Sequence, residues 1–299
     1  MRVFITGATG FIGFPVVKEL LFAGHDVLGM ARSDKGAHAL AAVGAKVHRG
    51  TLEDLDSVYR GAAQSEAVIH LGFNHDFSKF QENCAIDRRV IEALGEVLSG
   101  TDKPLIVTGG IGGLDGQGRI PTEEDNISPH FPFPRVSEQT ALSLLSKGVR
   151  ASVMRLPQVH DTLKQGLVTF FIAIAREKGV SPYVGKGQSR ASAAHVSDVA
   201  RLYRLALEKN EPGARYHAIG EEGVPMREIA EAIGRGLKVP VVSLSPDEAE
   251  SHFGWMARFV IADFMASSEM TRKKLNWNPI GPGLIEDLNR MDFSALAHH

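Results

Sequence analysis

The 299-residue sequence contains only one cysteine, Cys84, which excludes a disulfide framework and a zinc site built from cysteines. We expect Cys84 to be a small core residue, and we expect no metal site. No apolar run approaches the roughly 20 residues that span a bilayer, so no membrane association is expected. Met1 leads directly into an apolar segment, which leaves no room for a signal peptide. These absences predict a cytoplasmic protein.

Charge of one sign is also lacking. The chain has 33 Lys and Arg against 35 Asp and Glu, and no block of basic residues of the kind that binds nucleic acid. We therefore expect a small-molecule substrate and no nucleic-acid partner. The length and the 43% hydrophobic composition are sufficient for a large core, in one large domain or two unequal ones.

The first 13 residues carry the clearest motif. An apolar run at 3–5 precedes Gly7, Gly10 and Gly13, and an apolar-periodic segment follows them. A strand, a glycine turn and a helix in this order direct backbone N–H groups and the positive helix end at a phosphate. An ordinary glycine-rich turn is the alternative, but the flanking strand and helix favour dinucleotide binding. The expected cofactor contacts are Gly7, Thr9, Gly10, Phe11, Ile12 and Gly13.

Strands alternate with helices along the chain. We expect strands at 3–6, 26–30, 45–48, 67–71, 105–108, 151–156 and 216–219. Helices are expected at 11–23, 37–43, 55–62, 79–98, 135–146, 166–178 and 196–208. Nearly continuous apolar strands between helices are typical of a parallel sheet covered on both faces, and right-handed crossovers make it doubly wound.

These patterns predict an α/β Rossmann fold with a smaller, mostly helical C-terminal substrate cap. The core is expected at 1–160, with returns near 190–220, and the cap at 161–299. Four further segments of the cap region are predicted to be helical: 226–237, 246–253, 268–275 and 283–291. Between 109 and 133 the pattern breaks into a loop too long for an ordinary connection, which is typical of a functional loop.

Several segments together resemble a known family, the extended or atypical short-chain dehydrogenase/reductases, which are epimerase/dehydratase-like Rossmann proteins. The matching segments are Thr6-Gly7-Ala8-Thr9-Gly10-Phe11-Ile12-Gly13, His70-Leu71-Gly72, Arg155-Leu156-Pro157, Ala194-His195-Val196-Ser197-Asp198-Val199-Ala200 and Leu275-Asn276-Trp277-Asn278-Pro279. The resemblance covers nearly the whole chain and implies an NAD(P) cofactor. It places further cofactor contacts at Leu71, Gly72, Phe73, Thr108 and Pro157. Relatives often dimerise through the helices near 80–98 and 135–147, so a homodimer is an open alternative.

The end of the second strand bears on cofactor choice. NAD-preferring relatives place an acidic residue there for the ribose 2′-hydroxyl. Here Arg32 and Ser33 follow, and a guanidinium pairs well with the oxygens of a 2′-phosphate, which favours NADP over NAD. Alternatively, Arg32 is a solvated loop residue and Asp34 binds the ribose. Thr51 and Leu52 stand where relatives have Asp-Leu beside the adenine.

The family's usual proton donor, a Tyr followed four residues later by Lys, is missing. None of the four tyrosines has a lysine at that spacing. By alignment, Pro134 occupies the place of the Tyr and Glu138 that of the Lys, and proline has no proton to give. Glu138 is alternatively an acid in the first turn of a helix, stabilised by the helix dipole. Ordinary catalysis of this superfamily is therefore not expected, although the cofactor site remains.

Replacement groups are sought at the strand ends. His75 could serve as an acid near neutral pH, oriented by Asp76 or Asn74, or it is a solvated loop histidine. Thr108 retains the helper hydroxyl. Ser137 either points into the cleft or caps a helix.

Further candidates lie on the substrate side of the expected cleft: Gly110, His160 and His195. The alternatives are a loop position for His160 and, for His195, contacts that hold the cap against the sheet. Trp255, Phe253 and Phe264 could line an apolar pocket of the cap, although packing in a core is the more common role of large aromatic side chains.

Three functions remain open. The leading hypothesis is NADPH-dependent reduction of a carbonyl or activated alkene in a small apolar molecule, with a non-standard proton donor. The second is a regulatory protein that binds NADP(H) and signals through a partner. The third is an epimerase or isomerase with tightly held cofactor, which ranks last because such relatives use the Tyr/Lys pair.

Overall fold

A seven-stranded sheet forms the centre of the computed structural model, which describes residues 1–131 and 134–294. Its order is β10-β6-β5-β4-β1-β2-β3, and every neighbouring pair is parallel. The strand order reverses between β1 and β4, and ligands of such sheets usually bind at this point, outside the carboxyl ends of the strands. The bounds of the strands are Arg2–Thr6 (β1), Asp26–Ala31 (β2), Lys46–Arg49 (β3), Ala67–His70 (β4), Pro104–Gly110 (β5), Arg150–Leu156 (β6) and Arg215–His217 (β10).

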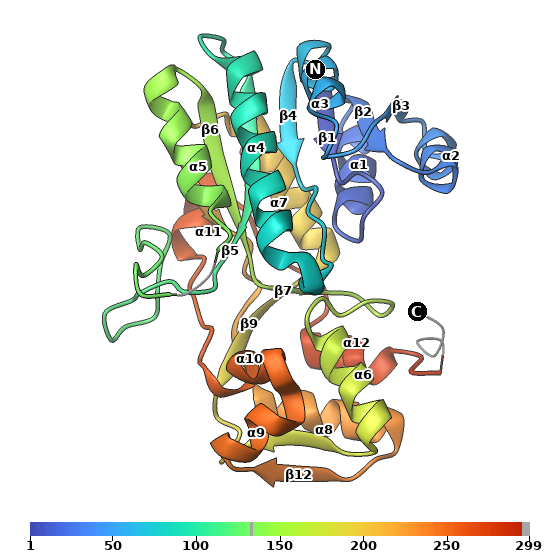
Figure 1. The fold of residues 1–299 in the computed structure, drawn as a ribbon, viewed down its shortest axis with the longest axis vertical. Helices are drawn as coiled ribbons and strands as arrows, with labels where there is room; N and C mark the ends of the chain where they lie inside the picture. The colour runs from blue at the N-terminus through green and yellow to red at the C-terminus, as the bar shows by residue number, and fades with distance from the viewer. Residues whose placement is uncertain (132–133, 295–299) are drawn as a thin grey trace.

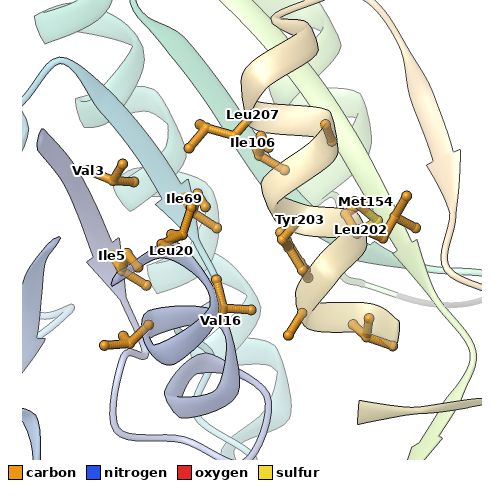
Figure 2. Packing of buried hydrophobic residues seen from close by; sticks show 14 of the residues in the cluster. Val3, Ile5, Val16, Leu20, Ile69, Ile106, Met154, Leu202, Tyr203 and Leu207 are labelled. Carbon is orange, nitrogen blue, oxygen red and sulfur yellow. The ribbon is translucent and has the colours of Figure 1, made fainter. Parts of the chain in front are cut away.

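Helices cover both faces of this sheet. One face carries α1 (Gly13–Phe22), α2 (Asp34–Ala42) and α7 (Val196–Lys209), and the other carries α3 (Leu55–Ala63), α4 (Phe80–Leu98) and α5 (Ser137–Ser143). Figure 2 shows side chains of α1 and α7 packed against the strands. Removing these apolar side chains from water drives the packing, at about 25 cal/mol per Å². The predicted Rossmann fold is confirmed.

The cap lies below the sheet in Figure 1, on the side toward which β4 points. Its helices are α6 (Val168–Lys178), α8 (Met226–Leu237), α9 (Pro246–Phe253), α10 (Ala257–Ile261) and α12 (Leu284–Arg290). A further helix, α11 (Glu269–Leu275), packs against α7 of the core. The cap has its own apolar core, which is separate from the two cores of the sheet.

Two small sheets in the C-terminal half were not predicted. One joins β11 (Glu221–Pro225), β9 (Arg190–His195) and β7 (Gln158–His160), and the other joins β12 (Val241–Leu244) to β8 (Ser181–Val184). These strands are short and only partly apolar, so their pattern does not separate them from loops.

Some predicted boundaries also differ from the structure. The first helix begins at Gly13 rather than at 11, because residues 7–12 form turns. β5 continues through Gly110, which pairs with Leu156 of β6. The helix predicted at 135–146 begins at Ser137 and ends in a 3-10 turn, Leu144–Lys147.

The long loop after β5 is present from Ile111 onward, with a bridge between Leu114 and Ile127. Residues 132–133, at the end of the predicted loop, lie outside the described residues. Cys84 is buried in α4, as expected. Within residues 1–131 and 134–294, no helix is long and apolar enough to cross a membrane.

Candidate functional site

The glycine turn after β1 is held in a shape that only glycine allows. Gly7 has a φ of +68°, and a Cβ on it would lie 2.7 Å from the backbone nitrogen of Gly72. A Cβ on Gly13 would lie 2.0 Å from the carbonyl oxygen of Gly7. The N–H of Gly10 donates to that same oxygen over 2.9 Å. The glycines therefore allow the turn and the close approach of α1 to β1.

The outer side of this turn suits an anion. No described residue accepts a hydrogen bond from the backbone N–H of Phe11 or Ile12, which immediately precede α1. A Cβ on Gly10 would meet only the oxygen of Gly7, at 3.2 Å, so the approach to Gly10 is open. The ammonium of Lys164 lies 5.8 Å from the centre of the Phe11 ring. Free N–H groups, a helix N-terminus and a nearby cation fit a pyrophosphate.

Lys164 was not found from the sequence. It belongs to the exposed segment between β7 and α6, where Asp161 accepts hydrogen bonds from the N–H groups of Leu163 and Lys164, both over 2.7 Å. Nothing in the local pattern indicates that this segment reaches the glycine turn, which lies about 150 residues earlier in the chain.

The end of β2 carries both residues that were predicted for the ribose, Arg32 and Asp34. Arg32 is exposed, and no other described residue forms a hydrogen bond or ion pair with it. Ser33 caps α2, because its hydroxyl accepts from the N–H of Gly36 over 3.2 Å. Asp34 forms an ion pair with Arg49, so its carboxylate already has a cationic partner. Among these three residues, Arg32 is the one whose side chain has no partner among the described residues.

The adenine side involves the predicted pair Thr51 and Leu52. The hydroxyl of Thr51 accepts from the N–H of Asp54 over 3.4 Å, at the start of α3. A Cβ on Gly72 would lie 3.0 Å from a methyl of Leu52. The structure therefore brings Leu52 and Gly72 together beside the glycine turn, although they follow different strands.

A buried polar chain runs behind the crevice. The hydroxyl of Thr6 is 2.7 Å from Nδ1 of His70, and Nε2 of His70 is 3.1 Å from Asp87. The hydroxyl of Ser137 donates to the other oxygen of Asp87 over 2.5 Å. All four side chains are buried, so Ser137 is a member of this chain rather than a helix cap.

Arg135 is the cation at the end of the buried polar chain that Ser137 forms. Its Nε donates to Ser137 over 2.8 Å, and Nη2 donates to the carbonyl of Thr108 over 3.2 Å. Nη2 also lies 3.8 Å from Asp87, and the guanidinium carbon lies 4.1 Å from the centre of the Phe73 ring. Arg135 therefore places a positive charge at the carboxyl ends of β4 and β5.

The charge state of Asp87 follows from these contacts. Burial opposes its ionisation, but the hydrogen bond from His70, the charge of Arg135 and the hydrogen bond from Ser137 outweigh burial. Together they hold the pKa of Asp87 below its ordinary value, so it is a carboxylate at neutral pH. An ionised Asp87 fixes the positions of Ser137 and Arg135.

Thr108 is the last buried hydroxyl of β5. It donates to the carbonyl of His70 over 2.7 Å, and it lies 2.7 Å from the hydroxyl of Tyr203 on α7. Burial raises the pKa of Tyr203, so this tyrosine stays protonated.

The sequence of the core matches the model of a known family. The model of the NAD dependent epimerase/dehydratase family matches residues 3–220. The chain belongs to this family. The match covers the glycine turn, all seven strands of the parallel sheet and both ends of the buried polar chain.

Three individual proteins illustrate the range of similarity. "Uncharacterized protein C2A9.02" of Schizosaccharomyces pombe is 47% identical over 96% of this chain and 98% of its own length. A 2-alkyl-3-oxoalkanoate reductase of Stenotrophomonas maltophilia is 26% identical over 81% of this chain and 77% of its own length. The structure of Thermus thermophilus UDP-glucose 4-epimerase in complex with NAD has a TM-score of 0.74 at 19% identity. The match covers 100% of this chain and 99% of the epimerase, so the two proteins share the fold.

At the position of the missing lysine, this epimerase/dehydratase family member has Glu138. Its carboxylate is buried and binds Arg155 over 2.6 and 2.8 Å, and Arg215 lies 3.1 Å away. Glu138 also stands in the first turn of α5. The charge of Glu138 is therefore neutralised by these two arginines. Pro134, at the position of the family's tyrosine, is exposed.

The predicted acid His75 lies beside the site. Its ring is 5.2 Å from that of Phe73 in an edge-to-face arrangement. Partial burial, followed by the charges of Arg135 and Lys164, lowers the pKa of His75. Asn74 and Asp76 do not orient its ring: Asn74 accepts from the N–H of Asp76, and Asp76 accepts from Ser78.

The other two histidines that were predicted for the site, His160 and His195, lie where β7 and β9 meet α12. His160 is fully buried, with Nδ1 2.7 Å from Asp287, and burial lowers its pKa although Asp287 opposes this. His195 lies 3.8 Å from Asp287 and caps α7 through Ser197. These contacts hold the cap against the core, which matches the structural alternative for His195.

The remaining predicted residues meet at one edge of the sheet. Gly110 ends β5 and pairs with Leu156, the residue before Pro157. Leu71, Gly72 and Phe73 directly follow β4, the neighbouring strand. The sequence thus predicted the strands that contribute to the site, whereas Arg135, Lys164 and Tyr203 became visible only in the structure.

Proposed function

We propose that this chain catalyses the NADPH-dependent reduction of a carbonyl or activated alkene in a small apolar molecule. The observation that carries the proposal is Arg135, whose guanidinium stands at the carboxyl ends of β4 and β5 between Thr108, Ser137 and Phe73. The similarity to a 2-alkyl-3-oxoalkanoate reductase supports a reductive reaction. The proton donor differs from the Tyr and Lys of the family because neither is present.

The residues present fit a dinucleotide. The glycine turn with the free N–H groups of Phe11 and Ile12 would hold the pyrophosphate, and Lys164 would add a positive charge. Arg32 would bind a 2′-phosphate. Leu71, Gly72, Phe73, Thr108 and Pro157 would flank the nicotinamide half at the strand ends. The cofactor, when bound, supplies the hydride.

Arg135 would act on the substrate oxygen. No described residue accepts a hydrogen bond from its Nη1, whereas Nε and Nη2 are held by Ser137 and Thr108. A fixed cation near an oxygen that becomes negative stabilises the transition state more than the ground state. Ser137 and Asp87 are then positioning residues, because they hold Arg135 without an exposed surface of their own.

The proton would come from Thr108, His75 or an ordered water. The hydroxyl of Thr108 donates a hydrogen bond to the carbonyl of His70. It must therefore break this bond before it can protonate the substrate. His75 is the other candidate, although its lowered pKa leaves it mostly neutral at pH 7. A threonine or a water molecule is a weak acid. The proposed mechanism therefore depends more on stabilisation of the developing negative charge by Arg135.

The test measures NADPH oxidation with a panel of ketones, aldehydes and enones, for the natural chain and Arg135→Met. We expect the substitution to lower kcat by about 10²–10³-fold, with unchanged cofactor affinity. Arg88→Met is the matched control, because Arg88 is exposed on α4 and, among the described residues, its ion pair is with Glu92. Cofactor binding without turnover of any compound class would overturn the proposal and favour the NADP(H)-sensing alternative.

A further inference from the structure

A chain of aromatic rings connects the core to the cap. Phe77 stacks on Trp255 with ring centres 4.3 Å apart and planes at 28°. Phe170 contacts both, at 5.7 and 5.5 Å. The rest of the chain is made by Phe73 and Phe80 on the core side, and by Phe259 and Phe264 on the cap side. We call these seven residues the aromatic arch.

No member of the aromatic arch is buried. Trp255 is 44% exposed and Phe170 is 37% exposed, and the other five are intermediate. The second tryptophan, Trp277, is only 2% exposed and packs in the main core. Contiguous apolar side chains that stay partly exposed at the surface are typical of a site that binds a ligand or a partner.

Both ends of the arch reach the candidate site. The guanidinium of Arg135 stacks on the ring of Phe73. At the other end, a Cβ on Gly112 would lie 3.9 Å from the ring of Phe264, and Gly112 follows β5 by two residues. The arch therefore begins beside β4, crosses to the cap and returns beside β5.

A cavity of about 350 Å³ lies at this returning end, and Arg135 and Gly112 line it together with Phe131, Ser128 and Gln139. Its size is within the range of small-molecule sites. Among the described residues, Arg135 is the one charged residue of this lining and Phe131 its one aromatic residue. The arch does not line the cavity but adjoins it at Arg135, which lies on the ring of Phe73, and at Gly112, which lies beside Phe264.

We propose that the substrate of the reduction proposed above is a planar aromatic or conjugated carbonyl compound, such as an aryl ketone or a quinone. Its rings stack against the arch, and its carbonyl oxygen accepts a hydrogen bond from Arg135. Aromatic rings attract one another by offset or edge-to-face contact beyond the area that they bury. A saturated ring of the same size gains only the burial of its surface.

The Phe77–Trp255 pair forms the closing contact of the arch. Two rings with centres 4.3 Å apart are in direct contact, so no third ring fits between them. The substrate therefore lies against the pair, on the side of Arg135. Since Phe77 belongs to the core and Trp255 to the cap, the contact also links the two parts of the chain over the substrate.

The test compares α-tetralone with its saturated counterpart decalone in the holoprotein. Fluorescence measures binding without turnover, because Trp255 is the exposed tryptophan and Trp277 is buried. We expect α-tetralone to quench the emission saturably, and to be reduced with a kcat/KM about tenfold above that of decalone. Phe77→Leu should remove most of this preference, and Trp255→Leu should also remove the quenching.

Phe22→Leu is the matched control, because Phe22 is 92% exposed at the end of α1, far from the arch. Equal reduction of both ketones by the natural chain would overturn the aromatic proposal and leave the reductase function intact. Saturable quenching by α-tetralone, without turnover of it or of any other compound of the panel, would support the aromatic site and overturn the reductase function. Absence of quenching, with decalone preferred, would overturn the aromatic site alone.

Discussion

The hydroxyl of Tyr203 lies 2.7 Å from the hydroxyl of Thr108, although 95 residues separate them. Thr108 donates to the carbonyl of His70, so the hydrogen between the two hydroxyls comes from Tyr203. Tyr203 is fully buried, and burial raises its pKa. This tyrosine near the candidate site therefore holds Thr108 in place and does not replace the missing tyrosine of the family.

Removal of this hydroxyl should affect stability more than turnover. We expect Tyr203→Phe to lower the free energy of unfolding by about 1 kcal/mol, the usual net contribution of a hydrogen bond. Urea denaturation measures this change. Tyr59→Phe is the control, because Tyr59 is remote from the site and its hydroxyl binds Glu96 at the surface. A large loss of kcat in Tyr203→Phe without loss of stability would contradict this role.

Placing the family's lysine at position 138 should destabilise the protein and should not raise its activity. In Glu138→Lys, the new ammonium would face Arg155 and Arg215 in a buried position. Breaking a buried ion pair in this way costs about 3–5 kcal/mol. Thermal unfolding of Glu138→Lys beside Pro134→Tyr tests this expectation. Pro134 is exposed, so its substitution should change stability by less than about 0.5 kcal/mol.

Arg32 should discriminate between the two nicotinamide cofactors. We expect Arg32→Ala to weaken the binding of NADPH by about 10–100-fold, because a charge-assisted contact to phosphate contributes roughly 1.5–3 kcal/mol. The binding of NADH should change by less than about twofold, which titration calorimetry measures for both cofactors. Arg60→Ala, an exposed arginine on α3, is the control. An equal loss for both cofactors would contradict the assignment.

His217 should make the protein sensitive to acid. It is buried, its Nδ1 donates to the carbonyl of Ser267 over 2.6 Å, and its Nε2 accepts from Arg155 over 3.0 Å. Burial, and then the charge of Arg155, lowers the pKa of His217 to about 4. The unfolded chain binds the proton near pH 6.5, so His217 lowers stability progressively as the pH falls from about 6.5 to 4.

The expected slope from this one residue is at most about 1.4 kcal/mol per pH unit. His217→Gln should reduce the slope of the unfolding free energy between pH 4 and 6.5, as urea denaturation at several pH values would show. His38→Gln is the control, because His38 is exposed on α2. An unchanged slope in His217→Gln would show that His217 does not cause the dependence.

The sequence predicted the features that depend on neighbouring residues. Gly7, Gly10 and Gly13 indicate a turn whose geometry is set within a few residues, and the apolar strands indicate a parallel sheet. The short strands of the small sheets were missed because β7 and β9 gain their stability from pairing with distant segments.

By itself, the sequence determined the Rossmann core and the strand ends that surround the site, because helix and strand periods and glycine geometry are local properties. Only the tertiary structure decided that Arg135 lies at the carboxyl ends of β4 and β5, and that Glu138 binds Arg155. It also decided that Tyr203 binds Thr108. These contacts depend on strand order, crossovers and burial, which join residues far apart in the chain and are not encoded in any short spacing.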